Sequence, residues 1–386
     1  MKQETDMPNL EPLFVSRIPP VERPVQRDKP LLKEIVEADR LIRASRGREH
    51  FKVSGKGLAV AVLDTGLRTT HVDFNGRVAA QRNFTSDDGG DVDNVSDGNG
   101  HGTNVAGIVC ANKDHVGIAP GAHVVPLKVL SNEGGGSFEA IKDALQWLLD
   151  NGEKHNVSVV CMSLGDSGNY INDTGFPLDA IQERIRSLKA KGIACCVAAG
   201  NDYYTHNSKQ GMSYPAIFRD TISVGAVYDL NEGSFSYNSG ATAFSTGEDR
   251  ITPFSQRLHD SVAGAVATDI FAPGAPIRSS GISNDRGESI QHGTSQATPV
   301  VAGVVLLLQE LFVNAHGRLP AVDDVVQWLR SSAVSIVDGD DEHDNVDHTN
   351  LTFRRVDALA ALETLSRSMA TAELMAGSPG IPRTHA

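Results

Sequence analysis

Residues 59–66 have the sequence AVAVLDTG, an apolar run of strand length that ends in an aspartate and a turn. Further runs of this kind recur along the chain, and stretches with helical periodicity separate several of them. Strands that are apolar almost throughout and alternate with helices indicate a parallel sheet covered on both faces. We therefore predict an α/β fold with a doubly wound, mainly parallel sheet and helices on both faces. The expected strands are residues 58–63, 124–130, 157–164, 193–199, 222–227 and 269–272, and the clearest helices are 137–150 and 178–191.

Asp64, directly after the first of these strands, belongs to a group of candidate catalytic residues. His101 stands in the block GHGTNVAG, and Ser295 stands in the block HGTSQATP. Taken singly, such residues are more often helix caps or surface groups. Together they are the parts that a serine nucleophile needs, because a base must take its proton and an acid must orient that base. The flanking residues predict a buried helix after His101 and another after Ser295, with Pro299 in the first turn.

The chain order Asp, His, Ser and the residues around each resemble the subtilisin-like serine peptidases. The resemblance extends over residues 55–363 and implies that Ser295 attacks a peptide carbonyl while His101 takes its proton and Asp64 orients the imidazole. It also implies that Asn201, which follows an Ala-Ala-Gly sequence, donates its side-chain amide to the oxyanion together with the backbone N–H of Ser295. A turn asparagine after glycine is the alternative for Asn201.

Two glycine-containing segments at strand ends are similar to the strips with which this family binds an extended peptide. Strand addition supplies main-chain hydrogen bonds with little side-chain specificity. The predicted substrate-binding residues are Gly134, Gly135, Gly136, Ser163, Leu164 and Gly165. A flexible loop is the alternative for residues 134–136. The expected partner is therefore a protein or peptide substrate bound in extended form.

Metal binding is not predicted for the catalytic residues, and the chemistry requires no cofactor. The segment 112–119 is shorter than the loop that holds a tightly bound calcium in secreted relatives, so we expect that site to be absent. Asp73 matches an aspartate of that site and is interpreted as a surface or capping residue. Acidic loops at 87–94 and 338–344 offer oxygen ligands for calcium, but neither completes an EF-hand, and solvated loops are the favoured interpretation.

Three positions depart from the family pattern, at Asn104, Gln296 and Thr298, and none of them removes an atom of the triad. A Ser-His-Asp esterase of the α/β-hydrolase kind does not fit, because the chain has no G-x-S-x-G elbow and its triad order differs.

Composition limits the classes of partner. Hydrophobic residues make up 40% and charged residues 22% of the 386 residues, as in an ordinary globular protein. The formal net charge of -13 argues against nucleic acid as a partner. The longest apolar run, 300–308, is too short to span a membrane. The 4 cysteines lie in apolar stretches and are interpreted as small buried hydrophobic residues.

The two ends of the chain are predicted to lie outside the catalytic domain. We expect an N-terminal extension over 1–54, a subtilisin-like peptidase domain over 55–365, and a C-terminal tail over 366–386 that begins as a peripheral helix. The N-terminus lacks the basic and apolar regions of a secretory signal, which predicts a cytoplasmic protein. Residues 10–24 are hypothesised to inhibit the active site or to bind a partner. A disordered linker, followed by a helix over 35–43 that packs on the domain, is the alternative.

The prediction is therefore an intracellular serine endopeptidase with a degradative or processing role. A maturation protease, whose partner is recognised by an insertion at 228–250, is one alternative. A catalytically inactive, peptide-binding relative is the other. The motifs define neither a cleavage preference nor an oligomeric state.

Overall fold

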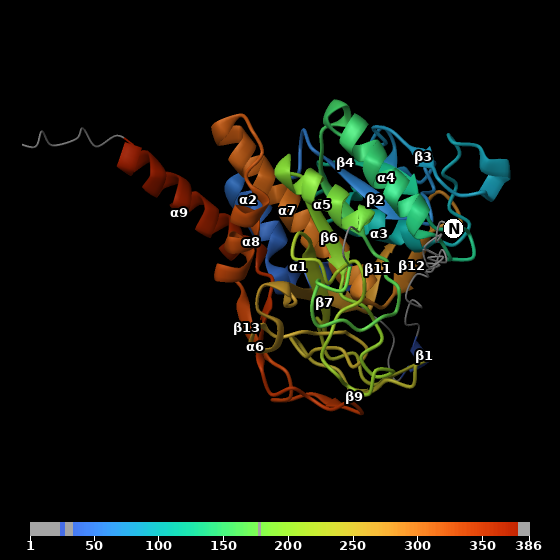
Figure 1. Ribbon diagram of the computed structural model, residues 1–386, viewed down its shortest axis with the longest axis vertical. Helices are drawn as coiled ribbons and strands as arrows, with labels where there is room; N and C mark the ends of the chain where they lie inside the picture. Colours follow the sequence, from blue (N-terminus) through green and yellow to red (C-terminus); the bar gives the residue numbers. More distant parts are fainter. Residues whose placement is uncertain (1–23, 28–33, 177–178, 377–386) are drawn as a thin grey trace, which may run out of the picture.

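The computed structural model describes residues 24–27, 34–176 and 179–376. Its centre is a sheet whose described strands run in the order β13-β15-β10-β7-β6-β5-β2-β4-β3 (Figure 1). Neighbouring strands are parallel from β15 to β3, and only β13 pairs antiparallel. The bounds in this order are Val334–Val337, Thr352–Arg355, Ile270–Ala275, Ile222–Tyr228, Ala194–Ala198, Val157–Met162, Ala59–Asp64, His123–Lys128 and Arg82–Asn83. The predicted sheet is confirmed, with every expected strand in place.

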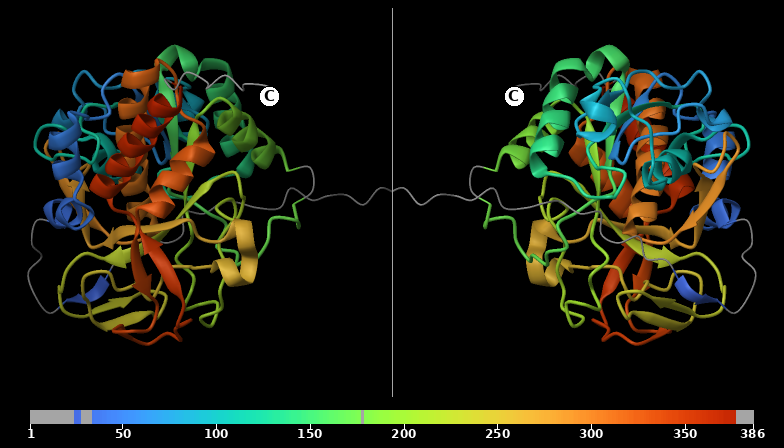
Figure 2. Two further views of the ribbon diagram at one scale, coloured as in Figure 1. Left: turned by 90° about the vertical axis from the view of Figure 1, so that its left-hand side faces the viewer. Right: turned by 90° about the vertical axis from the view of Figure 1, so that its right-hand side faces the viewer.

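Helices cover both faces of the sheet, as predicted (Figure 2). The residues of β2 alternate between two cores: Val60 and Val62 pack in one, and Ala59, Ala61 and Leu63 pack in the other. Because both faces of β2 are buried, the strand is apolar throughout rather than alternating with polar residues.

The first core is covered by α1 (Glu34–Ile42), α2 (Ala44–Phe51), α3 (His101–Cys110), α7 (Thr294–His316), α8 (Val322–Ser331) and the beginning of α9 (Ala358–Ala376). The second core is covered by α4 (Phe138–Asn151) and α5 (Ala180–Ala190). The helix predicted over 35–43 is α1, and its buried residues Ala38 and Ile42 belong to the first core. The later part of α9 projects from the body of the protein (Figure 1).

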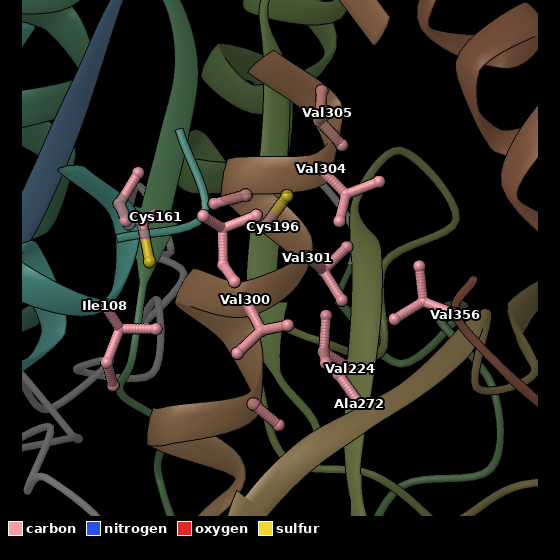
Figure 3. Close-up of a cluster of buried hydrophobic side chains, with 14 of the residues drawn as sticks. Ile108, Cys161, Cys196, Val224, Ala272, Val300, Val301, Val304, Val305 and Val356 are labelled. Carbon is pink, nitrogen blue, oxygen red and sulfur yellow. The ribbon is translucent and has the colours of Figure 1, made fainter. Parts of the chain in front are cut away.

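The long helix α7 forms the centre of the first core. Figure 3 shows its Val300, Val301 and Val304 beside strand residues that include Cys161 and Cys196. Complete burial of a valine or leucine contributes about 1.5–3 kcal/mol, so this contact is a principal source of stability. Among the residues that the structure describes, α7 is the one helix long and apolar enough to cross a membrane, and most of it is buried inside the protein.

All the cysteines are buried free thiols, which confirms their interpretation as small core residues: Cys110, Cys161, Cys195 and Cys196.

A smaller sheet lies beside the central one, in the order β1-β8-β9-β14. Its strands are Pro24–Arg27, Phe235–Tyr237, Thr242–Ser245 and His343–Asp344, so the predicted insertion at 228–250 supplies its two middle strands. A separate hairpin pairs β11 (Ile277–Ser280) with β12 (Glu288–Gln291). The remaining short elements are η1 (Val72–Phe74), η2 (Asp87–Gly90), η3 (Glu153–His155), α6 (Asp260–Ala263) and η4 (Gly264–Val266).

Candidate active site

Asp64 and His101 meet at the carboxyl edge of the sheet. Asp64 is the last residue of β2, and His101 is the first residue of α3. The Oδ1 atom of Asp64 lies 2.7 Å from Nδ1 of His101 and accepts a hydrogen bond of 2.7 Å from the backbone N–H of Thr65. Both side chains are almost completely buried. The carboxylate therefore holds a proton on Nδ1 and leaves Nε2 of the imidazole with a free lone pair.

Asp97, which the sequence analysis did not select, fixes the position of His101. Its carboxylate accepts hydrogen bonds from the backbone N–H groups of Gly100 at 2.8 Å and Thr103 at 2.9 Å, so it caps the start of α3. It also accepts from the hydroxyl of Thr65 at 2.9 Å, and that hydroxyl accepts from the N–H of Gly102 at 2.9 Å. The turn after Asp64 and the helix that carries His101 are thus joined through one carboxylate. The signal in the sequence was an aspartate shortly before the histidine at a helix start.

A buried lysine also binds the turn after Asp64. The Nζ atom of Lys128 donates to the Thr65 carbonyl at 2.5 Å and to Oδ1 of Asn132 at 3.0 Å, and it lies 3.1 Å from a carboxylate oxygen of Asp87. The interpretation of 87–94 as a solvated loop is therefore wrong for Asp87, because a fully buried cation needs a charged partner.

Ser295 is the second residue of α7, and its hydroxyl donates to the carbonyl of Ser163 at 3.3 Å. In return the Ser163 hydroxyl donates to the Ser295 carbonyl at 2.7 Å. Pro299 explains this second bond: it has no N–H for the Ser295 carbonyl, which is four residues earlier. The prediction that Pro299 lies in the first turn is wrong, because α7 begins at Thr294. The proline thus frees the Ser295 carbonyl for a hydrogen bond to the residue that follows β5.

The helices that carry His101 and Ser295 are in contact within their first turns. The side-chain amide of Gln296 donates to Oδ1 of Asn104 at 3.3 Å. Two of the positions that depart from the family pattern therefore contact each other. The Nε2 atom of His101 is buried and has no hydrogen-bond partner in the described parts of the chain. In apo structures the bond from nucleophile to base often forms only when substrate is present.

Asn201 follows β6, and Thr294 at the start of α7 orients it. Its Oδ1 accepts from both the backbone N–H and the hydroxyl of Thr294, each at 2.9 Å. The amide nitrogen is thereby directed away from Thr294; it is buried and finds no acceptor within the described ranges. Of the two predicted oxyanion donors, the Asn201 amide thus has an N–H group free to bind an acceptor at the helix start.

Gly293 borders the space in front of these donors. A Cβ added at this position would lie 3.2 Å from Nδ2 of Asn201 and 3.4 Å from the backbone nitrogen of Ser295. These are close to the distances at which an oxyanion would accept both hydrogen bonds. The absence of a side chain at Gly293 keeps that space open, a role that the sequence analysis missed.

The predicted substrate-binding segments lie after β4 and β5, the strands on either side of β2. Gly136 forms an isolated antiparallel bridge with Leu130, and the N–H of Ser131 donates to the Gly135 carbonyl at 2.7 Å. A Cβ at Gly135 would meet nothing within 4 Å, so this segment faces open space. Residues 163–165, after β5, are buried.

A cavity of about 240 Å³ lies next to residues 163–165. Asp166, which follows them directly, lines it together with Phe138, Tyr170, Phe176 and Tyr214. The aromatic lining suits an apolar side chain, with carboxylates at its border.

Asp73 was interpreted as a surface or capping residue; the surface position is wrong, whereas its Oδ1 does accept hydrogen bonds from the backbone N–H groups of Lys113 and His115. It is fully buried and lies with His71 and His115 in a cluster whose side chains could hold a metal ion. The second acidic loop also differs from its prediction, because Asp338 is fully buried and paired with the buried guanidinium of Arg257. The remaining exposed acidic group comprises Asp340, Asp341 and Glu342.

The parallel sheet, the Asp64–His101 pair and the serine at a helix start together define a class of hydrolase, and comparison with known proteins identifies it. Residues 55–356 match the model of the Subtilase family, so the chain belongs to that family. The resemblance stated above is thereby confirmed.

Among its relatives is the major intracellular serine protease of Bacillus subtilis (strain 168), 32% identical over 281 residues, which cover 72% of this chain and 76% of the relative. The intracellular serine protease of Paenibacillus polymyxa is 31% identical over 260 residues, covering 67% and 68% of the two chains. The cuticle-degrading serine protease of Arthrobotrys oligospora is 34% identical over 285 residues, covering 73% and 58%.

Proposed function

We propose that this protein is an intracellular serine endopeptidase in which Asp64, His101 and Ser295 form the catalytic triad and Asn201 donates to the oxyanion. The observation that carries the proposal is the buried hydrogen bond of 2.7 Å between Asp64 and His101, beside the helix start that bears Ser295. Family membership supports the reaction class. The names of two relatives, both intracellular serine proteases, support the intracellular setting.

The first step is acyl transfer to Ser295. The hydroxyl releases the Ser163 carbonyl and passes its proton to Nε2 of His101 as its oxygen bonds to the substrate carbonyl carbon. The negative charge that develops on the carbonyl oxygen is stabilised by Nδ2 of Asn201 and the N–H of Ser295. The imidazolium, stabilised by Asp64, then gives its proton to the leaving amine as the C–N bond breaks. Water, activated by the same imidazole, cleaves the resulting ester and restores the hydroxyl.

Substrate binding would use the backbone on either side of β2. An extended peptide between residues 134–136 and 163–165 forms main-chain hydrogen bonds, and this accepts many sequences. The aromatic cavity beside Asp166 would take one apolar side chain of the peptide.

A fluorophosphonate probe tests this proposal, because it labels only an activated serine. The wild type should be labelled and should cleave a denatured protein substrate, while Ser295→Ala should do neither. Ser283→Ala is the matched control, since it removes an exposed hydroxyl and should leave labelling unchanged. An unlabelled wild type that still binds peptide would instead support the inactive, peptide-binding alternative. No contact in the described parts of the chain favours that alternative.

The inhibitory role of residues 10–24 is a separate part of the proposal. Residues 10–23 lie outside the described residues, and residue 24 begins β1. Deletion of residues 1–23 should raise the rate of peptide cleavage if the segment covers the active site. An unchanged rate would contradict this role and leave the catalytic assignment intact.

A further inference from the structure

We propose that His71, Asp73 and His115 form a zinc-binding site at the end of α3 opposite His101. The three side chains are at most 5% exposed, and their ligand atoms lie within 4.8 Å of one another. They come from two segments: His71 and Asp73 from the start of η1, and His115 from the loop after α3. Two imidazoles and one carboxylate form a donor set typical of zinc.

The convergence of ligand atoms on one point is the first argument. Oδ2 of Asp73 lies 3.3 Å from Nδ1 of His71 and 2.7 Å from Nδ1 of His115. The same oxygen accepts from the hydroxyl of Ser280 at 2.7 Å. The Ser280 oxygen or a water is therefore available as the fourth ligand of a tetrahedral ion.

The protonation of His71 is the second argument. Its Nε2 lies 3.0 Å from the carbonyl of Gly287, and because a carbonyl only accepts, Nε2 carries the proton. In the neutral ring Nδ1 then has a lone pair that faces Oδ2 of Asp73; without metal it accepts from the N–H of Asp73 at 3.2 Å, and an ion would take the place of that hydrogen bond. A carboxylate oxygen beside a nitrogen lone pair is an arrangement that a cation stabilises.

The outer partner of His115 is the third argument. Its Nε2 is buried and lies 3.3 Å from a carboxylate oxygen of Glu288, the residue after Gly287. A metal on Nδ1 would move the proton of this ring to Nε2, where Glu288 would accept it. Histidine ligands of zinc commonly donate their other N–H to a carboxylate or to a backbone carbonyl, and here each ring has one of these.

The donor set distinguishes this site from a calcium site. Calcium takes six to eight oxygen ligands, and two imidazoles cannot supply them. Without metal, the Nδ1 proton of His115 bridges to Asp73 in place of the ion. Oδ2 of Asp73, which accepts hydrogen bonds from both His115 and Ser280, is the carboxylate oxygen that would ligate the ion.

The position of the site indicates a structural role. It joins η1 and the loop after α3, and through Ser280, Gly287 and Glu288 it reaches the β11–β12 hairpin. Because α3 begins at His101, an ion at its other end would hold the helix in place without taking part in the reaction.

The test is calorimetric titration of the full chain with Zn²⁺ near neutral pH, in a Ser295→Ala background that prevents self-cleavage. We expect one ion per chain, and at a hundredfold excess over Kd a rise in Tm of about 3–4 °C. His115→Gln and His71→Gln should abolish both effects. Co²⁺ in place of zinc should give the strong visible absorption of a four-coordinate site.

Two controls keep the result decisive. Asp341→Asn alters the exposed acidic group and should leave zinc binding unchanged; loss of binding there would place the ion on that loop and overturn the proposal. If the histidine variants fail to fold, Glu288→Gln serves instead, because it keeps every ligand and should weaken binding about 10–100-fold. The proposal is overturned if the protein binds no stoichiometric zinc, or if binding is unchanged in Glu288→Gln and in both histidine variants. The contact between His115 and Asp73 would then be the hydrogen bond alone.

Discussion

Substitution of Asn201 by alanine tests the oxyanion site most directly. The Nδ2 donor is buried, faces away from Thr294 and borders the space left open by Gly293. Removal of one such donor costs about 2.7–4 kcal/mol of transition-state stabilisation, which lowers kcat about 10²–10³-fold. KM should change little, because the charge develops only in the transition state.

The same substitution has a smaller effect on stability that can be separated from catalysis. Asn201→Ala leaves the N–H and the hydroxyl of Thr294 without their acceptor, which should lower the free energy of unfolding by about 1–3 kcal/mol. Denaturant unfolding measures this loss, and titration with a fluorophosphonate counts the active sites before kcat is calculated.

Gly293→Ala is the companion variant, because it keeps the amide and fills the space in front of it. The added methyl group would lie 3.2 Å from Nδ2 of Asn201, so we expect a loss of kcat similar to that of Asn201→Ala. The double variant should lose little more than the worse single variant, since both changes act on one site. A kcat for Asn201→Ala within about threefold of wild type, well short of the loss expected for a missing donor, would refute the assignment.

The remaining predictions concern positioning, specificity and pH. Asp97→Ala should lower the free energy of unfolding by about 1–3 kcal/mol and lower kcat, because the N–H groups at the start of α3 lose their acceptor and His101 is no longer fixed. Denaturant unfolding and peptide kinetics check this, and an unchanged kcat would contradict it. Asp202→Asn should reduce any preference for a basic over an apolar residue near the scissile bond by no more than about fivefold, because a partly solvated carboxylate contributes about 1 kcal/mol or less; kcat/KM on paired peptides measures it. Burial alone would raise the pKa of Asp338, but the Arg257 charge and several hydrogen bonds lower it below its usual value. In acid the unfolded chain therefore binds more protons than the folded chain, and the free energy of unfolding should fall as the pH drops below about 4. Asp338→Asn should remove this part of the acid sensitivity and lower the free energy of unfolding by about 3–5 kcal/mol at neutral pH, because Arg257 is left buried without its partner. Unfolding curves from acid to neutral pH, measured for both proteins in a Ser295→Ala background, check this. If the free energies of unfolding of Asp338→Asn and of the protein with Asp338 changed in parallel with pH, the reasoning would be contradicted.

The sequence predicted those parts of the fold in which a local pattern and the tertiary structure agree. The strand at 59–64 is apolar on both faces because both are buried, so its pattern indicated a parallel sheet directly. The motif around His101 similarly predicted a buried helix that begins at that residue.

What the sequence did not predict depends on partners far apart in the chain. The acidic loop at 87–94 looked solvated, since only the fold brings Asp87 to the buried Lys128. Asp73 looked like a surface residue, although its partners His115 and Ser280 come from later segments. The effect of Pro299 could not be predicted either, because the hydroxyl that compensates for its missing N–H belongs to Ser163, which follows β5 far away in the chain.

The strand at residues 24–27 has a consequence for the edge of the small sheet. It pairs with β8 along one side, so β8 is an inner strand only while this segment is attached. Cleavage just after residue 27 would release the segment and expose the backbone N–H and C=O groups of β8, which form a template for another strand. Truncated protein should therefore self-associate at concentrations at which the full chain does not, whatever its catalytic rate.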